Sequence, residues 1–265
     1  MEYSVVVPVY NSKATLRQLV QELEDFFREW SFSFEIILVD DGSTDGSAEE
    51  IRMLAARKDY IQKIYLPSNM GQQRALFTGL LQAKGDWVLT MDDDLQHDIR
   101  EVPKLIAQAK MGYDLVFGIY GDYGSKGLRA FGSKLVGQFF RWRYPSFSNL
   151  RVSSFRLISR QLYHHLEDRG DRFSYLSAEL LLHAQHVANV PVSRRERVYG
   201  KSGYNLKKCA VLYTQLWYNY GVKCLVLRGR KRHEEENTNG WSGQLPEKCH
   251  SADEVHGVRS GGCGL

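Results

Sequence analysis

An apolar stretch near the middle of the chain ends abruptly in residues 92–97, Asp-Asp-Asp-Leu-Gln-His. In an extended segment, side chains two residues apart point the same way, so Asp92, Asp94 and Gln96 share one side. Carboxylate and amide oxygens suit a hard divalent cation, which in proteins commonly also holds the phosphates of a substrate. The alternative is a solvated acidic loop that caps the next helix, and the loop alone leaves both interpretations open.

Two other apolar runs end in polar residues in the same way. Residues 5–9 lead into Tyr-Asn, and residues 36–39 lead into the polar segment 40–45, Asp-Asp-Gly-Ser-Thr-Asp. Both runs are rich in β-branched residues with little alternation, which is typical of strands buried on both faces of a parallel sheet. Within the polar segment, Asp41 is expected to bind a ligand. Asp45 is expected to be structural, stabilising the turn or capping the next helix.

Helical periodicity fills the intervals between these strands. Apolar residues recur every three or four positions from Leu16 to Trp30, which predicts an amphipathic helix. Ser47 with Glu50 is interpreted as a capping box that opens a second helix. The other expected elements are a strand near 61–66, a helix near 71–84, a strand at 86–91, a helix from about 101 and a strand at 114–119. This alternation predicts an α/β fold whose parallel sheet binds ligands beyond the carboxyl ends of its strands, so the polar clusters are expected to share one cleft.

Six segments, in order, resemble the family 2 glycosyltransferases. They are PVYN, VDDGSTDGS, SNMGQQRALFTGL and DDDLQH after the first four strands, then SFRLISR at 154–160 and RVYGKSGY at 197–204. Within the family they look most like the group that contains dolichol-phosphate mannose synthase and bactoprenol glucosyltransferases. The likeness covers about residues 3–208. It implies a GT-A fold with a mostly parallel sheet flanked by helices, a UDP- or GDP-sugar donor, and Mg²⁺ or Mn²⁺.

The resemblance also implies roles for individual residues. Asp92, Asp94 and Gln96 are the expected metal ligands, and Asp94 and Arg197 are the expected catalytic residues, with Arg197 forming a bidentate contact to the diphosphate. Asp93 is expected to lie behind the ligands or in solvent, and His97 either donates to a phosphate or is an ordinary loop residue. The expected donor-binding residues are Pro8, Val9, Tyr10, Asp40, Asp41, Asn69, Gly71, Asp92, Lys201 and Ser202.

Two departures from the family concern the acceptor. Residues 149–154 lack the aspartate that relatives often carry before the Phe-Arg pair, and residues 118–120, Gly-Ile-Tyr, lack the arginine that often follows the glycine. An alcohol acceptor needs a general base, whereas a phosphate is already an anion. The missing acid therefore favours a polyprenyl phosphate, with Arg129 and Arg156 as expected acceptor-binding residues. The alternatives are a glycan hydroxyl acceptor, with Glu179 as candidate base, and a non-catalytic nucleotide-sugar-binding relative.

Composition is consistent with one catalytic domain at 1–205. The net charge of +4 in 265 residues does not indicate nucleic-acid binding, and the four cysteines form no CxxC pair. No stretch reaches the ~20 apolar residues of a transmembrane helix. Residues 206–232 are expected to form an amphipathic helix that lies on the membrane or packs on the catalytic domain. Residues 233–265 are expected to be disordered.

The expected location is cytoplasmic, at the inner face of the membrane, since no signal peptide precedes the first strand. The further expected partner is either a membrane-anchoring protein or a second copy of the chain.

Overall fold

The computed structural model describes residues 1–121, 137–144, 150–166, 175–196, 213–214 and 216–222. The chain divides into two units, Met1–Cys224 and Leu225–Leu265, and all of the described residues belong to the first. The expected domain boundary at 205/206 and the expected disordered tail both fall outside the described residues.

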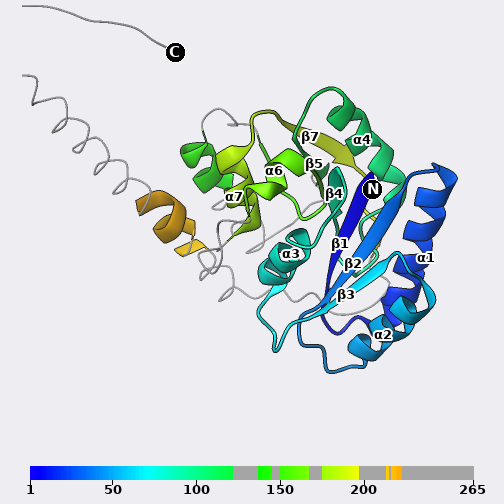
Figure 1. The fold of residues 1–265 in the computed structure, drawn as a ribbon. Coiled ribbons are helices and arrows are strands. Elements are labelled where there is room, and N and C mark those ends of the chain that lie inside the picture. The colour runs from blue at the N-terminus through cyan, green and yellow to red at the C-terminus, as the bar shows by residue number, and fades with distance from the viewer. Residues whose placement is uncertain (122–136, 145–149, 167–174, 197–212, 215, 223–265) are drawn as a thin grey trace, which may run out of the picture. The chain divides into compact units, whose positions relative to one another are not determined.

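A seven-stranded sheet in the order β3-β2-β1-β4-β6-β5-β7 forms the centre of the first unit (Figure 1). The strands are β1 Tyr3–Val9, β2 Phe34–Asp40, β3 Ile61–Tyr65, β4 Trp87–Thr90, β5 Leu115–Tyr120, β6 Arg156–Ser159 and β7 Val187–Val192. All neighbouring strands are parallel except β6, which is antiparallel to both β4 and β5. The expected α/β fold with a mostly parallel sheet is confirmed.

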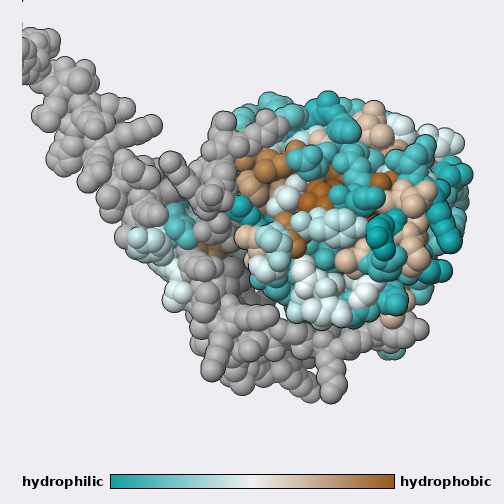
Figure 2. Space-filling view, turned by 60° about the horizontal axis from the view of Figure 1, so that its bottom comes forward, coloured by the Kyte–Doolittle hydropathy of each residue, from teal (hydrophilic) through white to brown (hydrophobic). Residues whose placement is uncertain are grey.

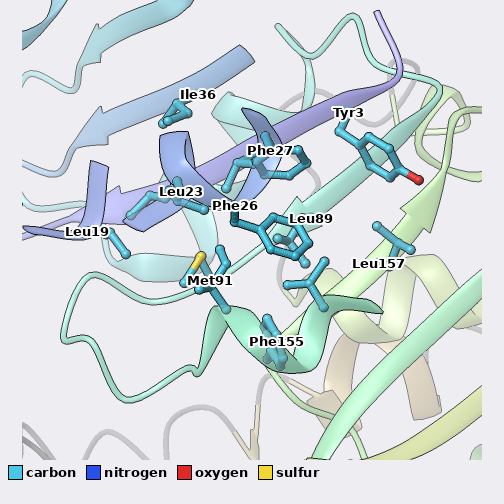
Figure 3. Packing of buried hydrophobic residues seen from close by; sticks show 14 of the residues in the cluster. Tyr3, Leu19, Leu23, Phe26, Phe27, Ile36, Leu89, Met91, Phe155 and Leu157 are labelled. Atoms are coloured by element: carbon cyan, nitrogen blue, oxygen red, sulfur yellow. The ribbon is translucent and has the colours of Figure 1, made fainter. Parts of the chain in front are cut away.

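Helices cover both faces of the sheet, as parallel strands buried on two sides require. On one face the buried cluster joins α1 Lys13–Glu29, α2 Ser47–Arg57 and α4 Val102–Lys110 to the strands, and the short 3-10 turn η1 Ile99–Glu101 precedes α4. The other face carries α3 Gln72–Leu80, α6 Arg160–His164, α7 Leu176–His183 and the helical turn η4 Trp217–Val222. Figure 3 shows Phe26 and Phe27 of α1 close to Leu89 of β4 in the first cluster.

The expected capping box at Ser47 is wrong. The N-cap of α2 is Gly46, which adopts a left-handed conformation with φ +90°, and Ser47 is the first helical residue. The Ser47 hydroxyl donates to Asp45 instead, and Glu50 forms an ion pair with Arg17 of α1. Because both side chains already have these partners, they do not exchange the reciprocal backbone bonds of a capping box.

Two glycines of the third motif, SNMGQQRALFTGL, are needed for different structural reasons. A Cβ at Gly79 would clash with Val6 of β1 and meet Val39 of β2 at 3.0 Å, so this glycine allows α3 to approach the sheet closely. Gly71 has open space around it, but its φ of +91° is disfavoured for residues with a Cβ.

No helix in the described ranges is long and apolar enough to cross a membrane.

Candidate functional site

The polar segments after β1, β2 and β4 lie at one edge of the sheet, because these strands are parallel and in register. The Tyr10 N–H donates to Asp93 Oδ2 at 3.1 Å, and the Thr15 hydroxyl donates to the Asp93 carbonyl at 2.7 Å. The Asp41 N–H in turn donates to the Val9 carbonyl at 2.8 Å. The sequence prediction that these clusters come together at one edge is confirmed. On the face shown in Figure 2, hydrophilic residues surround a smaller group of apolar ones.

The segment after β2 is held by its own side chains. Asp45 accepts from the Lys13 and Ser47 N–H groups at 3.0 and 2.9 Å, so it joins the starts of α1 and α2. Although burial opposes it, hydrogen bonding to the carboxylate, chiefly from the Ser47 hydroxyl, lowers the pKa of Asp45. Asn11, with φ +54°, accepts from the Thr44 N–H at 2.8 Å. The structural role expected for Asp45 is confirmed.

Asp41 holds the third motif against the second. Its buried carboxylate accepts from the Met70 N–H at 2.7 Å and from the Gly71 N–H at 2.9 Å. Burial raises the pKa of Asp41 despite these bonds. The bonds place residues 69–71 beside the end of β2, which brings the predicted donor-binding residues Asn69 and Gly71 next to Asp41. Its contact with a nucleobase or ribose stays a prediction.

Asp92 joins the acidic loop to two other segments of the chain. It accepts from Gln72 Nε2 of α3 at 2.5 Å and from the Ser154 hydroxyl at 3.0 Å. The His97 Nδ1 accepts from the Asp92 N–H at 3.1 Å, so the ring proton lies on Nε2, 3.4 Å from Asp92 Oδ2. Burial lowers the pKa of His97, which keeps the ring neutral, and the ring packs on Phe155. His97 therefore orders the loop from inside.

Asp93 and Asp94 have different environments. Burial raises the pKa of Asp93 to about 6, and its carboxylate is directed back at β1. Asp94 Oδ1 accepts from the Gln96 N–H at 3.2 Å, and Leu95 between them has φ +61°, a conformation that is uncommon for a residue with a Cβ. The tight turn at Leu95 thus fixes the direction of the Asp94 carboxylate.

Two arginines that follow β7 bond to the acidic loop and to the residue just after it. Arg194 donates to the side-chain oxygen of Gln96 and lies over the Tyr120 ring, 5.2 Å from its centroid. Arg195 bonds Asp98 at 3.0 Å and Glu22 of α1 at 2.6 Å. These contacts hold the residues before the predicted phosphate loop against the acidic loop. Arg197, Lys201, Ser202 and Arg129 lie outside the described residues.

The acidic loop carries carboxylate and amide oxygens, the ligand types of a divalent cation that also binds a diphosphate. Within the described ranges, no three His, Cys, Asp or Glu side chains converge as a complete metal cage. Mg²⁺ usually needs only one or two protein carboxylates when substrate phosphates complete its coordination. Asp92 and Asp94 stay the predicted pair of carboxylates for such an ion. The amide oxygen of Gln96, the third predicted ligand, accepts from Arg194 in this structure.

Arg156 is a buried cation at the first residue of β6. Its side chain donates to the Thr90 hydroxyl at 3.1 Å and to the Ser177 hydroxyl at 2.7 Å, and only 1% of the residue is exposed. Burial lowers its pKa to about 10, and the nearby charge of Asp92 opposes that shift. Direct contact with an acceptor stays a prediction. In this structure Arg156 is a fixed positive charge behind the strand ends.

Three buried polar atoms at this sheet edge have no hydrogen-bond partner in the part of the chain that the structure describes. They are Asp40 Oδ1 at the end of β2, the Tyr120 hydroxyl at the end of β5 and Arg156 Nη2. A buried polar atom without a partner costs free energy, and a bound ligand, ion or water can supply the missing bond. Sequence reasoning missed Tyr120, although it noted that the family's arginine is absent beside it. It also missed Gln72, Ser154 and Arg194, whose contacts join distant segments.

The family model of glycosyl transferase family 2 matches residues 4–179. The chain belongs to this family. Among the curated proteins, it is 32% identical over 207 residues to the undecaprenyl-phosphate 4-deoxy-4-formamido-L-arabinose transferase of Pseudomonas fluorescens, covering 76% of this chain and 60% of the relative. The protein with the same name from Edwardsiella ictaluri is 34% identical over 229 residues, covering 84% and 67%. The chain thus spans about 60% of the length of the first relative.

Solved structures show the same fold. The glucosyl-3-phosphoglycerate synthase of Mycobacterium tuberculosis, determined with Mn²⁺, UDP and phosphoglyceric acid, has a TM-score of 0.57 at 22% identity, covering 83% of this chain and 78% of that one. The mannosyl-3-phosphoglycerate synthase of Rubrobacter xylanophilus has a TM-score of 0.62 at 16% identity, covering 87% and 76%. The expected GT-A fold is confirmed.

Proposed function

We propose that this protein transfers a sugar from a nucleotide-sugar donor to a polyprenyl phosphate, with inversion at the anomeric carbon. The single observation that carries the proposal is the pair of undecaprenyl-phosphate sugar transferases that match most of the chain at 32% and 34% identity. The site agrees with it in two ways. Carboxylates lie where a cation and a diphosphate would bind, and positive charge lies behind them at Arg156.

The donor binds over the ends of β1, β2 and β4. Pro8, Val9 and Tyr10 form one wall for the nucleoside, and Asp41, with Asp40 beside it, accepts from the base or ribose. The diphosphate lies between the acidic loop and the segment that contains Arg197, Lys201 and Ser202. A cation held by Asp92 and Asp94 would neutralise charge on the leaving diphosphate.

The acceptor phosphate supplies its own nucleophile. One phosphate oxygen attacks the anomeric carbon while the bond from that carbon to the diphosphate breaks, and the nucleoside diphosphate leaves with the electron pair. Because the attacking oxygen is already anionic, no side chain has to remove a proton. Arg129 binds the acceptor phosphate, and Arg156 attracts it from behind the strand ends, which orients the nucleophile opposite the leaving group.

The alternative, a hydroxyl acceptor with Glu179 as base, has less support. Glu179 lies on α7 with 3% of the residue exposed, and its Oε1 accepts from the Tyr220 hydroxyl at 2.8 Å. A general base must come within hydrogen-bond reach of the proton that it removes. Glu179 is buried between α7 and η4 and faces Tyr220 rather than the acidic loop.

The test offers donor and acceptor together. The full chain is incubated with a panel of radiolabelled UDP- and GDP-sugars, including UDP-4-deoxy-4-formamido-L-arabinose, with Mg²⁺ or Mn²⁺ and vesicles that contain undecaprenyl phosphate. We expect a radiolabelled lipid whose sugar has the opposite anomeric configuration to the donor. Transfer to an added glycan, with undecaprenyl phosphate ignored, would refute the proposal and favour Glu179. Donor binding without transfer to any acceptor would favour a non-catalytic relative.

A further inference from the structure

Two segments of this chain contain basic residues but no carboxylates. Neither 123–166 nor 197–233 contains Asp or Glu, although acidic residues are common in the rest of the chain. The basic residues of the first segment are Lys126, Arg129, Lys134, Arg141, Arg143, Arg151, Arg156 and Arg160. Those of the second are Arg197, Lys201, Lys207, Lys208, Lys223, Arg228, Arg230, Lys231 and Arg232. Such one-sided charge suits an anionic partner.

The fold brings these distant segments together through aromatic rings. Trp142, on a helical segment at 137–143, stacks on Trp217 of η4 with ring centroids 4.7 Å apart and planes at 27°. Phe139 meets the same Trp217 ring edge-on at 5.5 Å. The Arg143 side chain donates to the Tyr220 carbonyl at 2.8 Å. The carboxylate-free segments therefore share one packed contact.

The aromatic residues of this contact are divided between core and solvent. Phe139 and Tyr220 are buried beneath it, whereas 48% of Trp142 and 59% of Tyr218 is exposed. Arg141, next to Trp142, is also exposed. Tryptophan and tyrosine rings have an apolar body and a polar tip, and such rings are enriched where one end is apolar and the other is wet.

We propose that Arg141, Trp142 and Tyr218, supported from beneath by Trp217, form a docking surface for an anionic lipid bilayer. The inference rests on the proposed function, because a polyprenyl phosphate is reached only at a membrane. Aromatic rings enter the boundary between headgroups and acyl chains, while basic side chains are attracted by anionic headgroups. A second copy of the chain fits less well, because the two copies would bring like charges together.

The experiment measures binding of the full chain to vesicles. Wild-type protein should co-sediment with mixed phosphatidylcholine–phosphatidylglycerol vesicles, and less with pure phosphatidylcholine, with binding weakened by salt. We expect Trp142→Ala and Arg141→Glu each to weaken binding to the mixed vesicles about tenfold. Trp30→Ala is the matched control, because Trp30 is also 48% exposed but lies at the end of α1. It should bind as the wild type does.

Separate measurements keep the possible failures apart. Thermal unfolding checks that each variant folds, and Arg141→Glu keeps the test valid if loss of the tryptophan stack unfolds the protein. Transfer to a short, water-soluble polyprenyl phosphate tests the proposed function without a bilayer, and Trp142→Ala should retain it. Unchanged vesicle binding in both folded variants would overturn the docking surface even if transfer occurs. So would a change of Trp142→Ala in oligomeric mass without lipid, because the partner would then be a second copy.

Discussion

The polar groups at the strand ends are hydrogen-bonded differently in the two halves of the sheet. In the parallel half, β3-β2-β1-β4, the carboxylates after the strands have hydrogen-bond partners in neighbouring loops, as Asp41 accepts from the Gly71 N–H and Asp45 from the Ser47 N–H. In the mixed half, β6-β5-β7, Arg156 Nη2 and the Tyr120 hydroxyl are buried and have no partner within the described residues. Among the described groups that follow the parallel strands, Asp40 Oδ1 is an exception and has no partner.

This difference indicates two ways of preparing a site. Loops that are already bonded internally present a ligand with a fixed shape, so little ordering is required when the ligand binds. Unpartnered buried groups cost the free protein about 1–3 kcal/mol each, a cost that a ligand removes when it supplies the missing bond. We therefore infer that the parallel half is rigid before the donor binds, and that the mixed half is completed by the acceptor.

The largest expected effect is the loss of a carboxylate of the acidic loop. Asp94→Asn should lower the rate of transfer at least 100-fold, because it removes a metal ligand and about 3 kcal/mol of charge stabilisation at the leaving diphosphate. Excess chelator should abolish transfer by the wild type. Radiolabelled lipid formed per minute is the measurement. Asp86→Asn, just before the opposite end of β4, is the control and should retain activity. Full turnover in chelator would contradict the metal assignment.

The next effect tests the buried cation of the mixed half. Arg156→Met should raise KM for the polyprenyl phosphate about tenfold, since the site loses a positive charge behind the strand ends. It should not lower the free energy of unfolding, because a buried charge that forms no ion pair with any described carboxylate is replaced by an apolar chain of similar length. Steady-state kinetics and chemical denaturation are the two measurements.

The control for that prediction is Arg160→Met. Arg160 follows the other end of β6 and bonds the Gly85 carbonyl at 3.3 Å. This variant should leave KM for the acceptor unchanged. If Arg156→Met destabilises the fold and leaves KM unchanged, the charge is structural and the contrast between the halves fails.

The sequence predicts the parallel half better than the mixed half. Strands β1, β2 and β4 are β-branched or apolar runs followed at once by polar residues, so their positions are visible in the sequence. Strand β7 was not predicted, since its VANVPV segment is short and contains Pro191, which is compatible with its position at the sheet edge. Contacts such as Asp92–Ser154 join residues far apart in the sequence, which no local pattern reports.

The third prediction concerns the anchor between the halves. Hydrogen bonding from Arg100, followed by that from Arg195, lowers the pKa of Asp98 from 3.8 to about 2 although burial opposes it. Because the folded pKa lies below the unfolded value, this stabilisation is present above pH 3.8 and is lost as the pH falls through 2.

Asp98→Asn should therefore cost about 1.5 kcal/mol at pH 7, less than the full shift implies because Arg100 is largely exposed. Denaturant unfolding of wild type and variant from pH 7 to pH 2 measures the difference. The two stabilities should converge at the acid end. A constant difference at every pH would show that the ion pairs contribute nothing.

The smallest expected effect concerns a single hydroxyl group. Tyr120→Phe removes only the phenol oxygen at the end of β5, an atom that is buried and has no partner in the described structure. Burial raises the pKa of Tyr120, so the group is a neutral hydrogen-bond donor at every physiological pH. Its loss should raise the free energy of unfolding by about 1 kcal/mol, because the folded protein no longer buries an unsatisfied polar atom.

The same substitution should impair function if the Tyr120 hydroxyl donates a hydrogen bond to the acceptor phosphate. We expect KM for the polyprenyl phosphate to rise about fivefold, equivalent to the loss of one hydrogen bond of about 1 kcal/mol, while donor affinity is unchanged. Tyr113→Phe, before the other end of β5, should change neither quantity. A gain in stability together with a rise in acceptor KM is the informative result, since a purely structural hydroxyl changes only stability. If stability and KM both stay unchanged, the Tyr120 hydroxyl already has a partner such as a buried water. Tyr120 would then not support the inference that the acceptor completes the mixed half of the sheet.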